Sequence, residues 1–155
     1  MRAAIIAALG ADAALTAIVG GRIRARVALL GGLQPTDFGP EGDLVGPALV
    51  VVLEARTREG DAADDGKVIA SRQAFAIYGY APAGEDAFDL IRAAQRQARR
   101  VLHRARLTPA DETRVRWRDT RWQSLTPEQV DAAYTPGIPV MVARFDAIIA
   151  DPIDD

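Results

Sequence analysis

Six arginines occur between positions 92 and 106, and four of them recur at every fourth residue. The six are Arg92, Arg96, Arg99, Arg100, Arg104 and Arg106. Residues four apart lie on one side of an α-helix, so this spacing predicts a slowly winding row of guanidinium groups. A guanidinium presents a planar fork of N–H donors that suits phosphates and carboxylates. Three interpretations therefore remain open: phosphate binding, an interface between subunits, or a solvated helix face.

The carboxylates that could pair with this row gather in a turn-rich segment earlier in the sequence. Its charged residues are Arg58, Glu59, Asp61, Asp64 and Asp65, and a second acidic stretch ends the sequence at residues 151–155. Opposite charges on different parts of one chain favour pairing between copies, so a subunit interface is the preferred interpretation and these residues are its candidate contacts. Aromatic residues for base stacking are not interleaved with the arginines, which weakens the nucleic-acid alternative.

The same carboxylates admit a calcium or magnesium loop as a second interpretation. Asp61, Asp64 and Asp65 offer the oxygen ligands that these ions prefer. However, no glutamate stands at the offset that an EF-hand uses for its bidentate ligand. A solvated turn is therefore preferred, and no metal is expected.

The sequence offers little to an enzyme. It contains no cysteine, which excludes disulfides, thiolate nucleophiles and cysteine-ligated metal centres. The single histidine, His103, is interpreted as a helix residue beside the arginines rather than as a general base. The motifs GxxxxGKS/T, GxGxxG, GxSxG and HExxH are absent. We therefore expect no catalytic residues and no cofactor.

The composition indicates an ordinary globular domain. The chain has 155 residues, of which 49% are apolar and 26% charged, so one domain spanning residues 1–155 is expected. Its net charge of −2 and pI of 5.4 argue against a protein whose whole surface binds nucleic acid. Of its 19 basic residues only Lys67 is a lysine, and an arginine-rich surface suits interfaces. Because no run reaches about 18 apolar residues, no membrane span is expected.

Periodicity and turn residues predict the elements that position these side chains. Residues 2–9 form a folded helix rather than a signal peptide, because Asp12 interrupts the apolar run and can cap a second helix over 13–19. We expect strands at 22–27, 48–55, 68–80, 113–123 and 139–149, a loop at 28–46, the arginine-bearing helix at 85–106, and a helical turn at 125–130 capped by Thr126. The predicted fold class is α+β. A mainly antiparallel sheet of about four to five strands, with a long β-hairpin, packs against two or three helices.

The order of these elements resembles a known family. The stretch from Leu9 to Ile23, LGADAALTAIVGGRI, is followed by a Pro/Gly-rich loop, PALVVV at 47–52, the hairpin, a central helix and a last strand with VARF at 142–145. This arrangement resembles the tail-terminator (tail-completion) proteins of long-tailed phages and gene transfer agents over nearly the whole chain. The acidic hairpin tip and the insert at 123–138 depart from that family, and leave open another head–tail connector protein, such as a stopper or neck protein.

The resemblance implies a structural virion protein without catalytic residues. Members of the family form a ring, typically a hexamer, that closes the head-proximal end of the tail tube and meets the connector or stopper proteins of the neck. The ring is assembled in the cytoplasm of the bacterial host, and DNA passes through it without specific binding. A nucleic-acid-binding domain that uses the arginine row is the alternative from another class.

The hairpin is longer than a compact core of this size needs, so we expect its tip and the loop at 28–46 to reach a neighbouring subunit or ring. Deleting residues 59–66 should leave the fold intact, since the tip is polar, and should abolish the joining of tails or rings. Circular dichroism checks the fold, and electron microscopy of assembled particles checks joining. Particles joined as in the wild type would refute this role of the tip.

Overall fold

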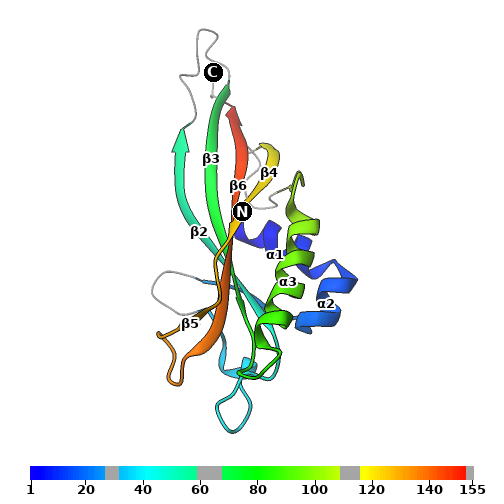
Figure 1. Ribbon diagram of the computed structural model, residues 1–155. Helices are drawn as coiled ribbons and strands as arrows, with labels where there is room; N and C mark the ends of the chain where they lie inside the picture. The colour runs from blue at the N-terminus through cyan, green and yellow to red at the C-terminus, as the bar shows by residue number, and fades with distance from the viewer. Residues whose placement is uncertain (27–31, 59–67, 109–115, 153–155) are drawn as a thin grey trace.

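The computed structural model describes residues 1–26, 32–58, 68–108 and 116–152, and its strands form a curled sheet with the helices on one face (Figure 1). The helices are α1 (Arg2–Gly10), α2 (Ala13–Val19) and α3 (Ala87–Leu102), with a short 3-10 helix, η1, at Pro35–Asp37. The strands are β1 (Ile23–Ala25), β2 (Ala48–Arg58), β3 (Val68–Tyr80), β4 (Arg116–Leu125), β5 (Gln129–Asp131) and β6 (Ile138–Pro152). The strand order is β1-β2-β3-β6-β4, and β5 pairs with β6.

The predicted α+β class is confirmed, with two differences in the sheet. The sheet has six strands, because residues 129–131 form the additional strand β5 beside the start of β6. It is also mixed, since β1 runs parallel to β2, with Ile23 opposite Leu49. Parallel neighbours need a crossover rather than a tight turn. The long loop between β1 and β2 supplies that crossover.

The antiparallel pair of β3 and β6 forms the centre of the sheet. The two strands pair over the whole length of β3. Successive residues face opposite sides, so Phe75 and Ile77 face the helices, whereas Tyr78 and Tyr80 lie on the other side, which we call the open face. Phe75 stacks on Phe145 of β6, with the ring centroids 5.2 Å apart. β2 pairs along β3, which confirms the predicted hairpin, and the hairpin tip at 59–67 lies outside the described residues.

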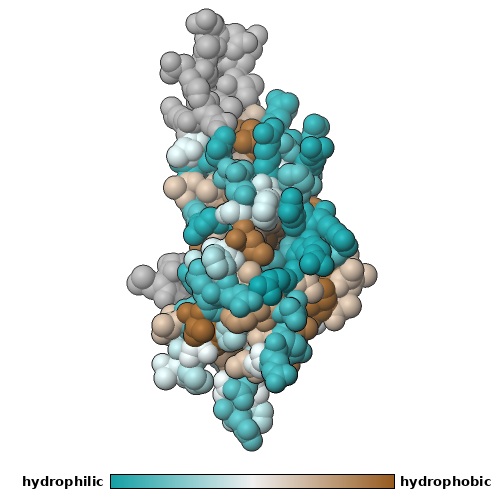
Figure 2. Space-filling view, viewed as in Figure 1, coloured by the Kyte–Doolittle hydropathy of each residue, from teal (hydrophilic) through white to brown (hydrophobic). Residues whose placement is uncertain are grey.

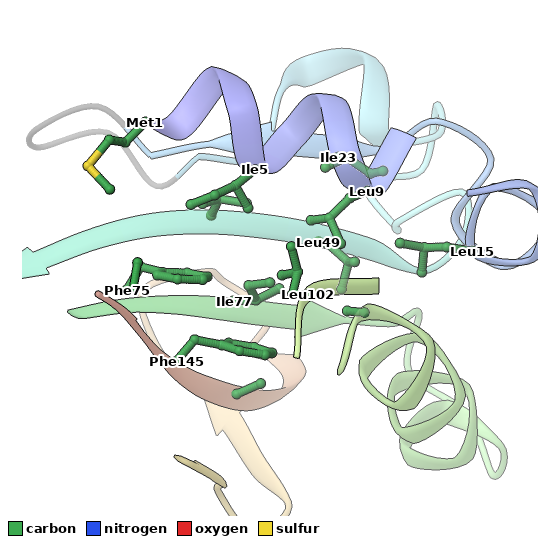
Figure 3. Packing of buried hydrophobic residues seen from close by; sticks show 14 of the residues in the cluster. Met1, Ile5, Leu9, Leu15, Ile23, Leu49, Phe75, Ile77, Leu102 and Phe145 are labelled. Atoms are coloured by element: carbon green, nitrogen blue, oxygen red, sulfur yellow. The ribbon is translucent and has the colours of Figure 1, made fainter. Parts of the chain in front are cut away.

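α1 closes the core over β2. Its residues Ile5 and Leu9 are fully buried in a cluster that includes Leu49 and Phe75 (Figure 3). The predicted folded helix at the start of the sequence is therefore confirmed. Among the described residues no single helix is long and apolar enough to cross a membrane. Only α1 and α2 taken together reach that length and composition, and the chain bends by 93° between them.

α2 begins and ends where the sequence predicts. The Asp12 carboxylate accepts a hydrogen bond from the Leu15 N–H at 2.8 Å and thereby caps the helix. Gly20 ends it with φ 57°, a left-handed conformation that glycine adopts without steric cost. Asp12 also accepts from Gln97 Nε2 of α3 at 3.1 Å. One carboxylate therefore starts α2 and ties it to α3.

A buried glutamine holds α3 to the sheet. Gln95 Nε2 donates to the Ile77 carbonyl of β3 at 2.8 Å and to the Met141 carbonyl of β6 at 3.0 Å. The amide reaches both strands because Gly79 has no side chain. A Cβ there would lie 2.8 Å from this nitrogen and 3.1 Å from Ile91 Cγ2. This contact decides which side of α3 faces the solvent.

Part of the segment 32–46 packs on the open face of its own sheet. Asp37 is fully buried, and its carboxylate accepts from Arg24 Nη2 and from the Gln34 N–H, both at 2.8 Å. Leu44 belongs to a second apolar cluster around Tyr80. The tip of the loop at 40–43 remains exposed, and the expectation that the loop reaches a neighbour stays a prediction.

The segment at 125–130, predicted as a helical turn, is extended instead. Thr126 caps no helix: its N–H donates to the Val142 carbonyl at 2.9 Å, and its hydroxyl accepts from the Val142 N–H at 2.8 Å. The chain then continues into β5, with Val130 opposite Pro139. The Thr-Pro signal for a helix start is local, and tertiary pairing with β6 overrides it.

The buried pair of Asp37 and Arg24 makes stability depend on pH. Burial alone would raise the pKa of Asp37, but the hydrogen bonds from Arg24 and the Gln34 N–H outweigh it, and the pKa lies below its usual value. A lowered carboxyl pKa stabilises the fold above the unfolded pKa of about 3.9. That stabilisation is lost as the pH falls through the folded pKa.

We therefore expect Asp37→Asn to lower the free energy of unfolding by about 2 kcal/mol at about pH 7. The difference from the wild type should begin to shrink below about pH 4 and disappear once the pH is below the lowered pKa of folded Asp37, where the wild-type carboxyl is protonated in both states. Urea denaturation at both pH values measures it. The matched control is Glu54→Gln, whose carboxylate pairs with Arg144 on the open face and should contribute less than about 1 kcal/mol. Equal losses in the two variants at neutral pH would contradict this role of Asp37.

Candidate interaction surface

The outer side of α3 carries arginines because its inner side packs on the sheet. The buried residues of the helix are Ala87, Ile91, Ala94, Gln95, Ala98 and Leu102, which form one stripe along its inner side. Between them, Arg96, Arg99 and Arg100 are exposed and Arg92 is half-buried. Figure 2 shows hydrophilic side chains gathered along the side of the molecule where α3 lies. Four of the predicted contact residues therefore share one face.

The helix ends earlier than predicted, which changes the positions of Arg104 and Arg106. α3 ends at Leu102, and Arg104 adopts a φ of 64°, which residues other than glycine rarely do. The Arg104 N–H donates to the Thr120 carbonyl of β4 at 2.6 Å. The prediction of a helix to residue 106 is wrong because the chain leaves the helix to bond with β4.

Two further hydrogen bonds fix β4 against the end of α3, and a third, within β4, orients the Thr120 hydroxyl. Trp117 Nε1 donates to the Thr120 hydroxyl at 2.6 Å, and this hydroxyl donates to the Ala105 carbonyl at 2.7 Å. The Trp122 N–H donates to Nδ1 of His103 at 3.2 Å. His103 lies beside the arginines, as expected, and its ring joins the helix end to the neighbouring strand.

Arginines from α3, from the segment after it and from β4 form one continuous surface, which we call the arginine surface. It comprises Arg96, Arg99, Arg100, Arg104, Arg106, Arg118 and Arg121. The hollows along this surface are continuous, because neighbouring hollows share lining residues. Arg96 and Arg99 line two neighbouring hollows, and His103 joins the second of these to a third beside β4. Sequence reasoning did not identify Arg118 and Arg121 as contacts, because no local signal places β4 beside α3.

An aromatic ring holds Arg99 in place. Its Cζ lies 3.9 Å from the ring centroid of Trp122, which is half-buried. Trp117 and Trp122 lie five residues apart but both face the helix side of the sheet, because the register of β4 shifts between Trp117 and Asp119. Such a shift is the mark of a β-bulge. The cation–π contact orients the guanidinium and leaves its charge unneutralised.

Most of the arginine surface lacks a carboxylate partner within the part of the chain that the structure describes. Asp119 pairs with Arg121 Nε at 3.0 Å, and this hydrogen bond holds the pKa of Asp119 below its usual value. Arg92, at the border, pairs with Glu128 and, at 3.6 Å, with Asp89. Among the described residues no ion pair engages Arg96, Arg99, Arg100, Arg104, Arg106 or Arg118. The surface therefore presents excess positive charge in a chain whose net charge is −2.

The acidic contacts predicted at the hairpin tip are not placed. Arg58 ends β2, whereas Glu59, Asp61, Asp64 and Asp65 lie outside the described residues. Neither their pairing with the arginines nor the alternative of a calcium loop is tested. Within residues 1–26, 32–58, 68–108 and 116–152, no group of three or more histidine or acidic side chains could hold a metal ion.

A different set of carboxylates gathers at the other end of α3. Glu85 and Asp86 precede the helix and Asp89 lies in its first turn, while Glu41 and Asp43 stand on the exposed loop tip. The loop and the helix start are neighbours, since residues 42–44 and 81–83 line one hollow. We call these five exposed carboxylates the acidic end. In Figure 1 the acidic end lies at the bottom of α3 and the arginine surface toward its top.

No protein-family model matches this chain, and no curated protein matches it. A chain in the solved virion of a native gene transfer agent particle is similar in structure, with a TM-score of 0.64 and 22% sequence identity. The match covers 97% of this chain and 94% of that chain. At this identity the similarity establishes a shared fold.

Replacing Arg99 should expose Trp122 to solvent without disturbing the core. We expect Arg99→Gln to increase acrylamide quenching of tryptophan fluorescence and to lower the free energy of unfolding by about 0.5–1 kcal/mol. Arg100→Gln is the matched control, because Arg100 contacts Gln97 rather than a ring. Trp117 is buried and should contribute equally in both variants. Identical quenching in the two variants would contradict the contact.

Proposed function

We propose that this chain is a structural protein of a phage-like virion, a tail terminator that closes the tail tube. The observation that carries the proposal is the shared fold with a chain of a gene transfer agent virion, over nearly the full length of both chains. The order of elements and the stretch from Leu9 to Ile23 resemble the terminators of such particles. This resemblance favours a terminator over a stopper or another neck protein.

In this proposal the chain acts by assembly rather than by catalysis. Its copies form a ring, expected to be a hexamer, at the head-proximal end of the tail. The ring contacts the tail tube protein on one side and a connector or stopper protein on the other, and DNA passes through without sequence-specific contacts. The lack of cysteine and of nucleophile motifs in the sequence fits a protein whose work is to present surfaces.

The shape of the sheet supports a subunit with several interfaces. β2, β3 and β6 extend past the helices at one end of the molecule (Figure 1). Residues 54–57 on the outer strand β2 are exposed there. A strand pair that projects beyond its own core can contact a neighbouring protein, which agrees with the role expected for the hairpin.

The arginine surface favours nucleic-acid binding as a second candidate function. Its guanidinium groups come from three consecutive segments and are mostly without carboxylate partners among the described residues. Such a surface could neutralise several phosphates, and its binding would weaken steeply with salt. This function would not require a ring.

The mass and symmetry of the purified protein separate the two functions. For a terminator we expect light scattering to report a closed assembly of the 16.6-kDa chain, with negative-stain images showing six-fold rings. A monomer that binds DNA would overturn the proposal. In that case the slope of affinity against salt should decrease in Arg96→Ala and Arg100→Ala.

A further inference from the structure

We infer that the arginine surface binds the acidic end of a second copy of this chain, so that copies join in series. The inference rests on the proposed function, because it names the contact that builds the ring. The acidic partner it assigns is a described surface, made of Glu41, Asp43, Glu85, Asp86 and Asp89. The hairpin tip, which the sequence suggests, is not needed for this contact.

The first argument is charge. Within the described chain, the guanidinium groups of Arg96, Arg100, Arg104, Arg106 and Arg118 have no ion pair. At the acidic end, Glu41, Asp43, Glu85 and Asp86 likewise form no ion pair among the described residues, and Asp89 shares Arg92 at 3.6 Å. The two surfaces therefore carry opposite charges, and most of these charges have no ion-pair partner among the described residues. Complementary surfaces of this kind steer association and fix its orientation.

The second argument is distance. α3 has 16 residues and therefore spans about 24 Å. The acidic end lies before this helix and in its first turn, whereas the arginine surface begins at Arg96 and continues past the end of the helix, so most of the two surfaces cannot reach each other within one copy. Pairing between copies joins two different patches, which is a heterologous contact. Such contacts close into a ring when the rotation between neighbours allows it.

The third argument concerns the kind of partner. Trp122 is already covered by Arg99, and the large apolar side chains exposed in the described ranges are Val45 and Val130, neither of them aromatic. Among the described residues, the surface therefore offers no free phenylalanine, tyrosine or tryptophan ring on which a base could stack. Val45 is 56% exposed and stands two residues after Asp43, where it can add apolar contact to the charge pairs. A carboxylate-bearing protein surface fits these features better than a phosphate backbone.

Two neutralised variants test the inference. The basic variant carries Arg100→Gln, Arg104→Gln and Arg118→Gln, and the acidic variant carries Glu41→Gln, Asp43→Asn and Glu85→Gln. All six side chains are exposed, so both variants should fold, as circular dichroism can check. The control variant carries Arg72→Gln and Arg144→Gln, which remove two cations from the open face of the sheet.

Each neutralised variant alone should be a monomer in sedimentation velocity, while the wild type and the control variant assemble. An equimolar mixture of the two variants should form a 1:1 dimer and nothing larger. The reason is that only one junction, between the intact acidic end of one variant and the intact arginine surface of the other, can form. The Kd of this dimer should rise about tenfold between about 50 mM and about 500 mM NaCl, because salt screens the charge pairs.

Three outcomes would overturn the inference. If the wild type forms rings and both neutralised variants form them equally well, the rings use another contact and the proposed function survives. If the wild type stays monomeric, the inference and the ring fail together. If short duplex DNA binds the wild type and the acidic variant but not the basic variant, while neither variant pairs with the other, the arginine surface recognises phosphate.

Discussion

The hydrogen bonds of Gln95 are the constraint on which the exposed features of this protein depend. One amide bonds to carbonyls on the two central strands, β3 and β6, and it can approach only because Gly79 lacks a side chain. A buried amide that bonds to two strands fixes the rotation of its helix as well as its position. With Gln95 inward, the arginines of α3 must face outward. This buried contact therefore helps to set the half of the arginine surface that lies on α3.

The excess of arginine over lysine has two physical uses in the fold. Some arginines act inside the molecule: Arg24 pairs with buried Asp37, Arg22 donates to the Pro47 carbonyl, and Arg26 stacks over Tyr78 at 4.7 Å. These contacts hold the chain around β1 and the loop that follows it. A planar guanidinium suits such half-buried positions because it can donate in several directions while it packs against a ring. Other arginines face outward along α3, the segment that follows it and β4.

Local features of the fold could be predicted from the sequence, whereas features that depend on distant partners could not. The Asp12 cap and the hairpin of β2 and β3 follow from neighbouring residues, and both are observed. Thr126 carries a good helix-start signal, but β6 supplies its hydrogen bonds. Arg104 continues the four-residue spacing, yet it leaves the helix because β4 accepts its N–H. The arginine surface divides in the same way. The arginines on α3 could be predicted from their spacing in the sequence, whereas those on β4 join the surface only through tertiary contacts.

The separation of charge along α3 also explains how a chain of almost balanced charge can assemble in one direction. A helix has a positive N-terminal and a negative C-terminal end, so the carboxylates at its start and the arginines toward its end both stabilise the isolated chain. The charges that stabilise the helix are therefore the same charges that the proposed contact uses. Assembly through them would not require charges that destabilise the fold. If positive and negative side chains were mixed on one surface, they would pair with each other within one copy. The surface would then no longer fix the orientation of a neighbouring copy. Because the two patches lie on different parts of the chain, each copy has one basic and one acidic contact, which is what the proposed ring of identical subunits requires.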